Sequence, residues 1–319
     1  MDANDRLPDG VWTAMRTLAL DRTTAVVVDR LRGAGIPCLL LKGPSFARWL
    51  YADESERSYV DIDLLVRPTN AAAAERELTT LGFVRSGFET IPDDRPRHAV
   101  TLLGPGSATV DLHRTLMGVV DGDRLFAALT GEAESLSVGG AEIDIPSPRG
   151  RAMVLALHAA KDAGRSEKVR RDLGRALEIL PEEVWRSAAE LARDLGAGEA
   201  FAAGVRHERA GVVLADHLGL SQEVGSSMAL RGTKSPPLAY GLDYVLKAPG
   251  VAEKGRFAIR KAFPPASFMR AWRPIARKGR LGLGTAYAIR PFWLLWRSVP
   301  ALRAVRRARR RAQASSRDA

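Results

Sequence analysis

Cysteine is almost absent from this chain of 319 residues, in which Cys38 is the single example. No intrachain disulfide can form, which fits a reducing compartment such as the cytoplasm. Long apolar runs are missing too, since none approaches the roughly 18 residues that a membrane-spanning helix needs. The stretch Met1–Asp5 has neither a basic start nor an apolar core, so we expect no signal peptide. These absences predict a cytoplasmic protein with no disulfide partner.

Acidic residues are scarce towards the C-terminus. Residues 231–319 contain 21 Lys and Arg against 3 acidic residues, a net charge of +18, whereas the remainder carries −7 and the whole chain +11. The high pI therefore belongs to this C-terminal extension, and the chain as a whole does not have the composition of a nucleic-acid-binding protein. Because its prolines interrupt helices, we expect that the extension does not form one long helix.

Aromatic residues stand beside arginines within residues 270–311. This composition suits an anionic membrane surface, which would make the protein peripheral to the inner face of the membrane. It also suits RNA or another anionic partner, and it fits equally a solvated, partly disordered extension with no partner.

Hydrophobic periodicity divides the rest of the chain into a mixed part and a helical part. The hydrophobic content of 46% is ample for real cores. An α+β fold follows, in which a mixed sheet with flanking helices precedes a helical domain and the basic extension. Up to residue 146 the pattern predicts helices over 10–33, 45–50, 71–81 and 121–130, and strands over 37–41, 59–66, 83–88, 99–103, 109–113 and 136–145, the last divided by a Gly139-Gly140 turn. Beyond it the pattern predicts helices over 148–163, 167–179, 181–195 and 198–218.

Two aspartates, Asp61 and Asp63, stand at the start of the apolar run that ends at Val66. On a strand they project from the same face, while Ile62 and Leu64 point into a core. Carboxylates this close repel each other, and a hard divalent cation such as Mg²⁺ removes the conflict. A surface strand edge or turn explains the same spacing equally well. A second such pair, Asp121 with Asp123, lies in a polar segment and is typical of a turn or helix start.

A turn of sequence Lys42-Gly43-Pro44-Ser45 follows the preceding apolar run. Lys42 could place a positive charge near phosphate, and Gly43 allows close approach of the backbone. Pro44 has no N–H to donate but suits the first turn of a helix, and Ser45 is a candidate hydroxyl donor. A solvated strand end and a plain strand-to-helix turn are the alternatives.

Asp111 is the candidate third carboxylate. On the strand 109–113, Asp111 and His113 share a face opposite Val110 and Leu112. A third acid from a neighbouring strand can help to bind a metal ion and orient or deprotonate an attacking hydroxyl. We expect His113 to hold Asp111 rather than to act as a base. Simple polar alternation on a half-exposed strand is the alternative.

These motifs, in this order, resemble the bacterial family of uncharacterised nucleotidyltransferases within the DNA polymerase β-type nucleotidyltransferase superfamily. The resemblance covers roughly residues 20–180. It rests on a strand ending in Lys-Gly, an Arg separated by three residues from Asp-x-Asp-Leu-Leu-Val, and four later motifs. These are matched here by Lys42-Gly43, Arg57, Asp61–Val66, Leu81-Gly82-Phe83, His98, Val110–His113 and His158 with Lys161. In the wider superfamily the turn is Gly-Ser, so the Lys-Gly-Pro-Ser turn departs from it.

The resemblance implies a nucleotidyltransferase-type catalytic domain over 36–146. Helices over 1–35 precede it, a helical domain over 147–228 follows, and the extension covers 229–319. It implies Mg²⁺ or Mn²⁺ on Asp61, Asp63 and Asp111, with an NTP as substrate. Arg57 would fix the aspartate loop or meet phosphate, and His158 and Lys161 would contact phosphate or substrate unless they are a core histidine and a solvated lysine.

The function expected on this resemblance is transfer of a nucleoside monophosphate from an NTP to an acceptor. The acceptor could be a small molecule such as an antibiotic, a natural-product peptide, a protein side chain or an RNA end. Two alternatives remain. One is a non-catalytic relative that binds nucleotide and docks through its basic tail, and the other is a phosphotransferase that uses the same metals.

Overall fold

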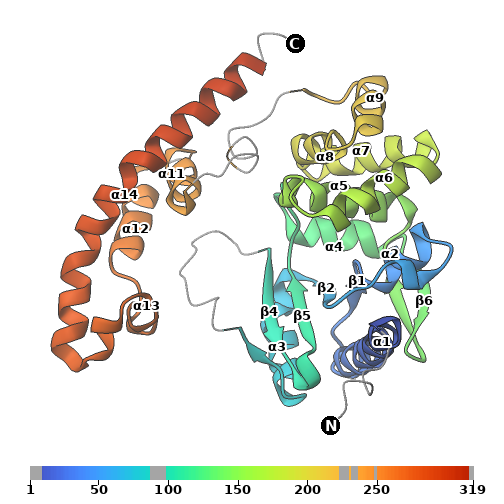
Figure 1. The fold of residues 1–319 in the computed structure, drawn as a ribbon, viewed down its shortest axis with the longest axis horizontal. Helices are drawn as coiled ribbons and strands as arrows, with labels where there is room; N and C mark the ends of the chain where they lie inside the picture. The colour runs from blue at the N-terminus through green and yellow to red at the C-terminus, as the bar shows by residue number, and fades with distance from the viewer. Residues whose placement is uncertain (1–8, 87–97, 223–229, 231–235, 248–249, 316–319) are drawn as a thin grey trace. The chain divides into compact units, whose positions relative to one another are not determined.

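The computed structural model describes residues 9–86, 98–222, 230, 236–247 and 250–315 (Figure 1). These residues fall into two compact units. Unit 1 takes in residues 9–86 and 98–220, and unit 2 takes in the described residues from 221 onwards. The finer division of the chain at residues 35, 146 and 228 stays a prediction.

Unit 1 is built on a five-stranded mixed sheet with the order β1-β2-β5-β4-β3. Strands β2 and β5 run parallel, and the other neighbours are antiparallel. A separate hairpin, β6 and β7, turns at Gly139 and Gly140 as predicted, with positive φ angles at both. The strands are β1 (Cys38–Leu40), β2 (Ile62–Val66), β3 (Val84–Arg85), β4 (Ala99–Leu103), β5 (Thr109–His113), β6 (Glu134–Val138) and β7 (Ala141–Ile145). The mixed α+β class is confirmed. Of the strand predicted over 83–88, only the short β3 is formed, and residues 87 and 88 lie outside the described residues.

Nine α-helices are described in unit 1: α1 (Asp9–Gly33), α2 (Pro44–Leu50), α3 (Ala71–Thr80), α4 (Gly122–Thr130), α5 (Pro148–Asp162), α6 (Glu167–Ile179), α7 (Glu182–Asp194), α8 (Gly198–Val205) and α9 (Arg209–His217). The single helix predicted over 198–218 is wrong, because the chain turns between α8 and α9. At that turn Gly211 lies so close to the Val205 carbonyl that a Cβ would be 1.9 Å from its oxygen. Such close packing of the two helix ends replaces the straight continuation that periodicity suggested.

The core of unit 1 explains which way the strand side chains point. Ile62, Leu64 and Val110 belong to one buried cluster together with Val27 and Leu31 of α1. Because side chains alternate along a strand, Asp63 must project from the opposite face. That face is covered as well, and α5, packed against α6, α7 and α8, is buried on nearly every side. The sheet therefore carries its acidic residues into a shielded space.

Unit 2 is helical, with α11 (Pro237–Lys247), α12 (Val251–Ala262), α13 (Ala266–Trp272), a 3₁₀ turn at Pro274–Arg277 and α14 (Gly279–Ser315). Helix α14 is 37 residues long and contains Pro291 and Pro300, so the prediction that prolines prevent one long helix is wrong. Each proline removes one backbone hydrogen bond, but packing against α11, α12, α13 and the 3₁₀ turn holds the helix along its length. Within the described ranges, no helix is long and apolar enough to cross a membrane.

Candidate active site

The two parallel strands of the sheet bring the central carboxylates together. Asp63 on β2 and Asp111 on β5 are register partners, and His113 follows on the same face of β5. One potential ligand atom from each of these three residues lies within 4.8 Å of the others. Asp63 and His113 are buried, whereas Asp111 is half-buried and accepts a hydrogen bond of 2.6 Å from the Thr101 hydroxyl. This grouping offers two carboxylates and an imidazole to a cation.

Asp61 lies immediately before β2 and is half-buried. Burial and the nearby negative charge of Asp63 raise the pKa of the Asp61 carboxyl above its usual range, with a further contribution from Asp111. Asp61 is therefore electrostatically coupled to both of the other acids, although it lies outside the three-residue group. A cation bound at this site would relieve the repulsion.

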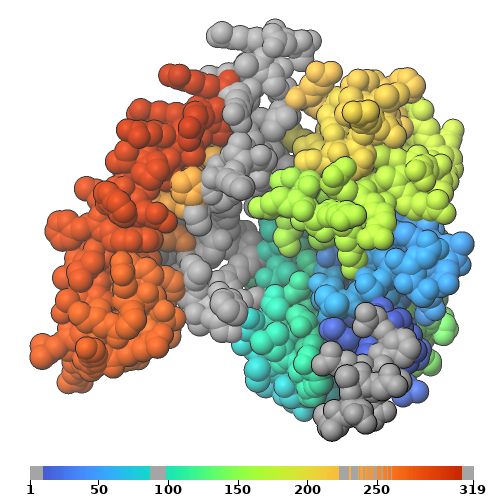
Figure 2. All heavy atoms as spheres, in the orientation of Figure 1, coloured from blue at the N-terminus to red at the C-terminus, as the bar shows by residue number. Residues whose placement is uncertain are grey.

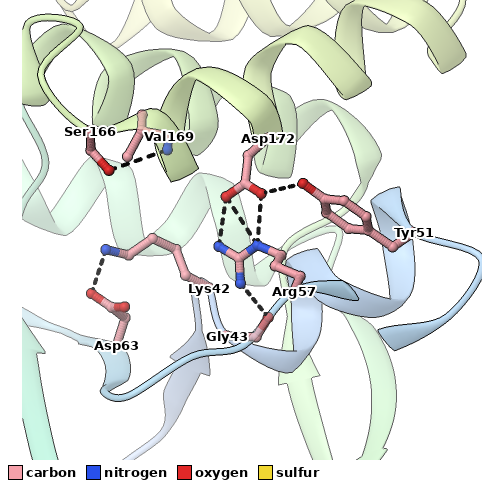
Figure 3. Close-up of polar contacts among 8 residues, drawn as sticks. All are labelled: Lys42, Gly43, Tyr51, Arg57, Asp63, Ser166, Val169 and Asp172. Carbon is pink, nitrogen blue, oxygen red and sulfur yellow. Dashed lines mark hydrogen bonds and ion pairs between the residues drawn. The ribbon is translucent and has the colours of Figure 1, made fainter. Parts of the chain in front are cut away.

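A positive side chain already contacts the most buried acid. The Lys42 ammonium lies 2.7 Å from Asp63 Oδ1 (Figure 3). His113 Nε2 lies 2.9 Å from the same oxygen. Burial opposes the charge on Asp63, but Lys42 and His113 outweigh it and hold the Asp63 pKa below its usual range. The sequence led us to expect that His113 holds Asp111, but His113 hydrogen-bonds Asp63 instead, because β2 and β5 are adjacent. The carboxylates of this group are compatible with a hard divalent cation such as Mg²⁺ or Mn²⁺.

Arg57 holds the glycine turn in place. Its guanidinium donates to both carboxylate oxygens of Asp172 on α6, at 2.8 to 3.0 Å, and to the Gly43 carbonyl at 3.1 Å (Figure 3). Tyr51 donates a further hydrogen bond of 2.8 Å to Asp172. Gly43 has a φ of 64°, a conformation that favours glycine. These contacts of Arg57 are to the glycine turn and α6 and not to the aspartate loop, so the two roles expected for it stay predictions.

Lys168 is a residue of this site that sequence reasoning missed. It lies in the first turn of α6, whose N-terminus is capped by the Ser166 hydroxyl accepting from the Val169 N–H (Figure 3). Burial lowers the Lys168 pKa, as do the positive charges of Arg57 and Lys42, while Asp172 and Asp61 oppose the shift. The signal available in the sequence was its place one turn before Asp172 on the predicted helix 167–179.

A small pocket next to Asp63 gathers further predicted residues. Lys42, His113, His158 and Lys161 line it together with His98, and the rest of its wall is apolar. Burial and the charge of Lys42 hold the His158 pKa well below its usual value, so this histidine is neutral at pH 7. Because His158 and Lys161 line the same pocket, they share one face of α5, as their spacing predicted.

Ser45 occupies a different position from these pocket residues. Its side chain is completely buried in α2, and within the described part of the chain its hydroxyl has no hydrogen-bond partner. The geometry therefore leaves the expected phosphate contact of Ser45 as a prediction.

A mixed sheet that presents acids from adjacent parallel strands, beside a lysine and a fixed glycine turn, defines a phosphate-handling type of site. A family model described as "uncharacterised nucleotidyltransferase" matches residues 10–210. The chain therefore belongs to this nucleotidyltransferase family, and the expected family and fold are confirmed. A comparison with curated proteins gave no significant match.

Solved structures of nucleotidyltransferases resemble the chain only distantly. The antibiotic-resistance factor ANT(2'')-Ia shares 13% identity at a TM-score of 0.33, covering 64% of this chain and 97% of its own. An antigenic nucleotidyltransferase-like protein from Paracoccidioides brasiliensis shares 17% at a TM-score of 0.34, covering 58% and 92%. The Thermotoga maritima CCA-adding enzyme, solved with tRNA, shares 13% at a TM-score of 0.29, covering 89% and 70%. At these TM-scores the assignment rests on the family model alone.

Proposed function

We propose that the protein is a metal-dependent nucleotidyltransferase that moves a nucleoside monophosphate from an NTP to an acceptor. The observation that carries the proposal is the convergence of Asp63, Asp111 and His113 within 4.8 Å, with Asp61 coupled to both acids. We propose Asp61, Asp63 and Asp111 as the metal ligands, and Mg²⁺ or Mn²⁺ as the ion. When bound, such an ion would neutralise charge on the phosphates and on the departing pyrophosphate.

In the proposed reaction an acceptor oxygen forms a bond to the α-phosphorus of the NTP, while the bond to the pyrophosphate oxygen breaks. The proton of the acceptor hydroxyl passes to Asp111, which is the most accessible member of the three-residue group. His113 orients Asp63 through the hydrogen bond at Oδ1. Asp111 and His113 thus have different roles on the same face of β5.

The positive groups around the acids would bind the triphosphate. Lys42, which pairs with Asp63, would move to a phosphate oxygen when the nucleotide binds, and the adjacent Gly43 turn would lie beside the triphosphate. Arg57 positions this turn through Asp172. His158 and Lys161 would meet the substrate from the pocket, and Lys168 would add a charge from α6. The cytoplasmic location inferred from composition stays a prediction.

The test is pyrophosphate release from each NTP with Mg²⁺, with and without a cell extract from the source. We expect Asp63→Asn and Asp111→Asn to lower release at least about 1,000-fold without unfolding the protein. Asp123→Asn is the matched control, because Asp123 lies in the first turn of α4 with its side chain 46% exposed, and this change should leave release unchanged. Undiminished release by both site variants would contradict the proposal.

A second candidate is a non-catalytic relative that binds nucleotide. It is favoured by the turn itself, because Pro44 has no N–H and the Ser45 hydroxyl is buried, so the turn lacks two donors that could contact a triphosphate. Nucleotide binding seen by calorimetry, with no pyrophosphate released for any NTP, would support this candidate.

A further inference from the structure

The outward face of α14 has an unusual composition along its length. At steps of three or four residues, Phe292, Leu295, Trp296 and Val299 all project into solvent, and the first three are 77%, 74% and 71% exposed. Leu281 and Ile289 are exposed further back along the helix. In Figure 2 the side chains of α14 form an extended orange-to-red surface. Large apolar groups therefore cluster over the first two-thirds of this helix without a partner within unit 2.

The other side of the same helix is packed. Ala286, Ala301 and Val305 are buried, and Trp293 lies edge-on against Trp272 with ring centroids 5.3 Å apart. Arg290 is buried too, 4.8 Å from the Trp272 ring. The exposed apolar face is therefore not the core of unit 2 left uncovered, because that core lies on the opposite side.

Positive charge continues the exposed face towards the C-terminus. After Val299 the outward positions at the same steps are arginines, Arg303, Arg306, Arg307 and Arg310, and all four are exposed. Helix α14 contains nine arginines and no acidic residue. One face thus presents an apolar section followed by a basic section.

We propose that this outward face of α14 docks the protein on a lipid bilayer with an anionic surface. Aromatic and aliphatic side chains enter the boundary between headgroups and acyl chains, while arginines bind lipid phosphates. Single-stranded RNA could stack on Phe292 and Trp296 but offers little to Leu281, Leu295 and Val299. A second copy of the same face would bring its four exposed arginines against another four, and α14 has no acidic residue to oppose them. The bilayer matches both sections of the face.

The test is flotation of the full chain with phosphatidylcholine vesicles that contain or lack phosphatidylglycerol. We expect binding only to the anionic vesicles, and weaker binding as salt is added. Two variant sets should each lower the affinity at least about tenfold: Phe292→Ser with Trp296→Ser, and the four exposed arginines replaced by Gln. The matched controls lie in unit 1 and should bind like the wild type: Trp12→Ser with Leu18→Ser, and Arg16, Arg22, Arg76 and Arg124 replaced by Gln, all exposed residues.

A nitroxide at Phe292→Cys gives a second readout, because Cys38 is buried and leaves a single reactive thiol. We expect this probe to gain contact with lipid-soluble oxygen when anionic vesicles are added. The proposal is overturned if vesicles do not bind, or if binding survives the apolar substitutions. RNA binding without vesicle binding would assign the face to nucleic acid instead. A dimer that the apolar variant dissociates, again without vesicle binding, would assign it to self-association.

Discussion

Units 1 and 2 use charged residues in opposite ways. In unit 1 the important charges are buried and paired one to one, as in Lys42 with Asp63 and Arg57 with Asp172, where each side chain is at most 12% exposed. In unit 2 four arginines of α14, Arg303, Arg306, Arg307 and Arg310, repeat along an exposed face at equivalent positions. In unit 1 the position of each charged residue therefore matters. In unit 2 the number of arginines on the exposed face of α14 matters instead. A single substitution should be severe in the first unit and mild in the second.

The sharpest way to break this contrast is to remove one arginine from each unit. Arg57→Leu leaves Asp172 as a buried carboxylate without its cation, so we expect a loss of about 3–5 kcal/mol in the free energy of unfolding. Arg306→Leu is the matched control, because its side chain is exposed and should change stability by less than about 0.5 kcal/mol. Urea unfolding of both variants measures the difference. Equal costs for the two substitutions would show that the Arg57 contacts are not a structural clamp.

Lys42→Met sharpens the contrast, since Lys42 is both a structural partner of Asp63 and a competitor for it. Without the ammonium, buried Asp63 loses its closest cation, and the metal-free protein should lose about 2–4 kcal/mol of stability. Because Mg²⁺ no longer has to displace Lys42, it should raise the melting temperature of the variant more than that of the wild type. Thermal unfolding with and without Mg²⁺ tests both statements. An identical Mg²⁺ effect in the two proteins would argue against binding of the ion at Asp63.

The smallest expected effect concerns pH and lies in unit 1. His158 has a folded pKa well below its unfolded value near 6.5, so below pH 6.5 the unfolded chain binds the extra proton and stability falls as pH falls. His158→Gln removes this term and should flatten the decline between pH 7 and 5 by about 1 kcal/mol. His207→Gln is a useful comparison, because His207 is only partly buried and its pKa is lowered in the same direction. A steeper decline in the His158 variant would contradict the assignment.

The parts of the site that lie close in sequence could be predicted well. Alternation along 59–66 and 109–113 put Asp63 and Asp111 on faces opposite the core, and the family resemblance brought the two strands together. The His113 contact could not be predicted, because it depends on the parallel register of β2 with β5. Asp172 and Lys168 come from a helix more than a hundred residues after the aspartate pair, and no local pattern shows where that helix packs.

In the C-terminal extension a local sequence signal gave a wrong prediction. Its prolines are reliable local signals against a helix, yet α14 continues through Pro291 and Pro300. Contacts with α11 through α13 outweigh two lost hydrogen bonds, and such contacts cannot be read from the segment itself. The positive charge of the extension was evident from composition. The division of one face into an apolar and a basic section could be recognised only once the structure showed that these residues form one helix.

The most direct test of the proposed nucleotidyltransferase activity is to compare an NTP labelled at the α-phosphate with the same NTP labelled at the γ-phosphate. Each is incubated with Mg²⁺, the full chain and a cell extract from the source, and label in products other than nucleotides and free phosphates is counted. The account predicts that the wild type transfers the α-label alone to the acceptor. With the Asp63→Asn variant the acceptor should stay unlabelled. Transfer of the γ-label, or of neither label while pyrophosphate accumulates no faster than without protein, would contradict it.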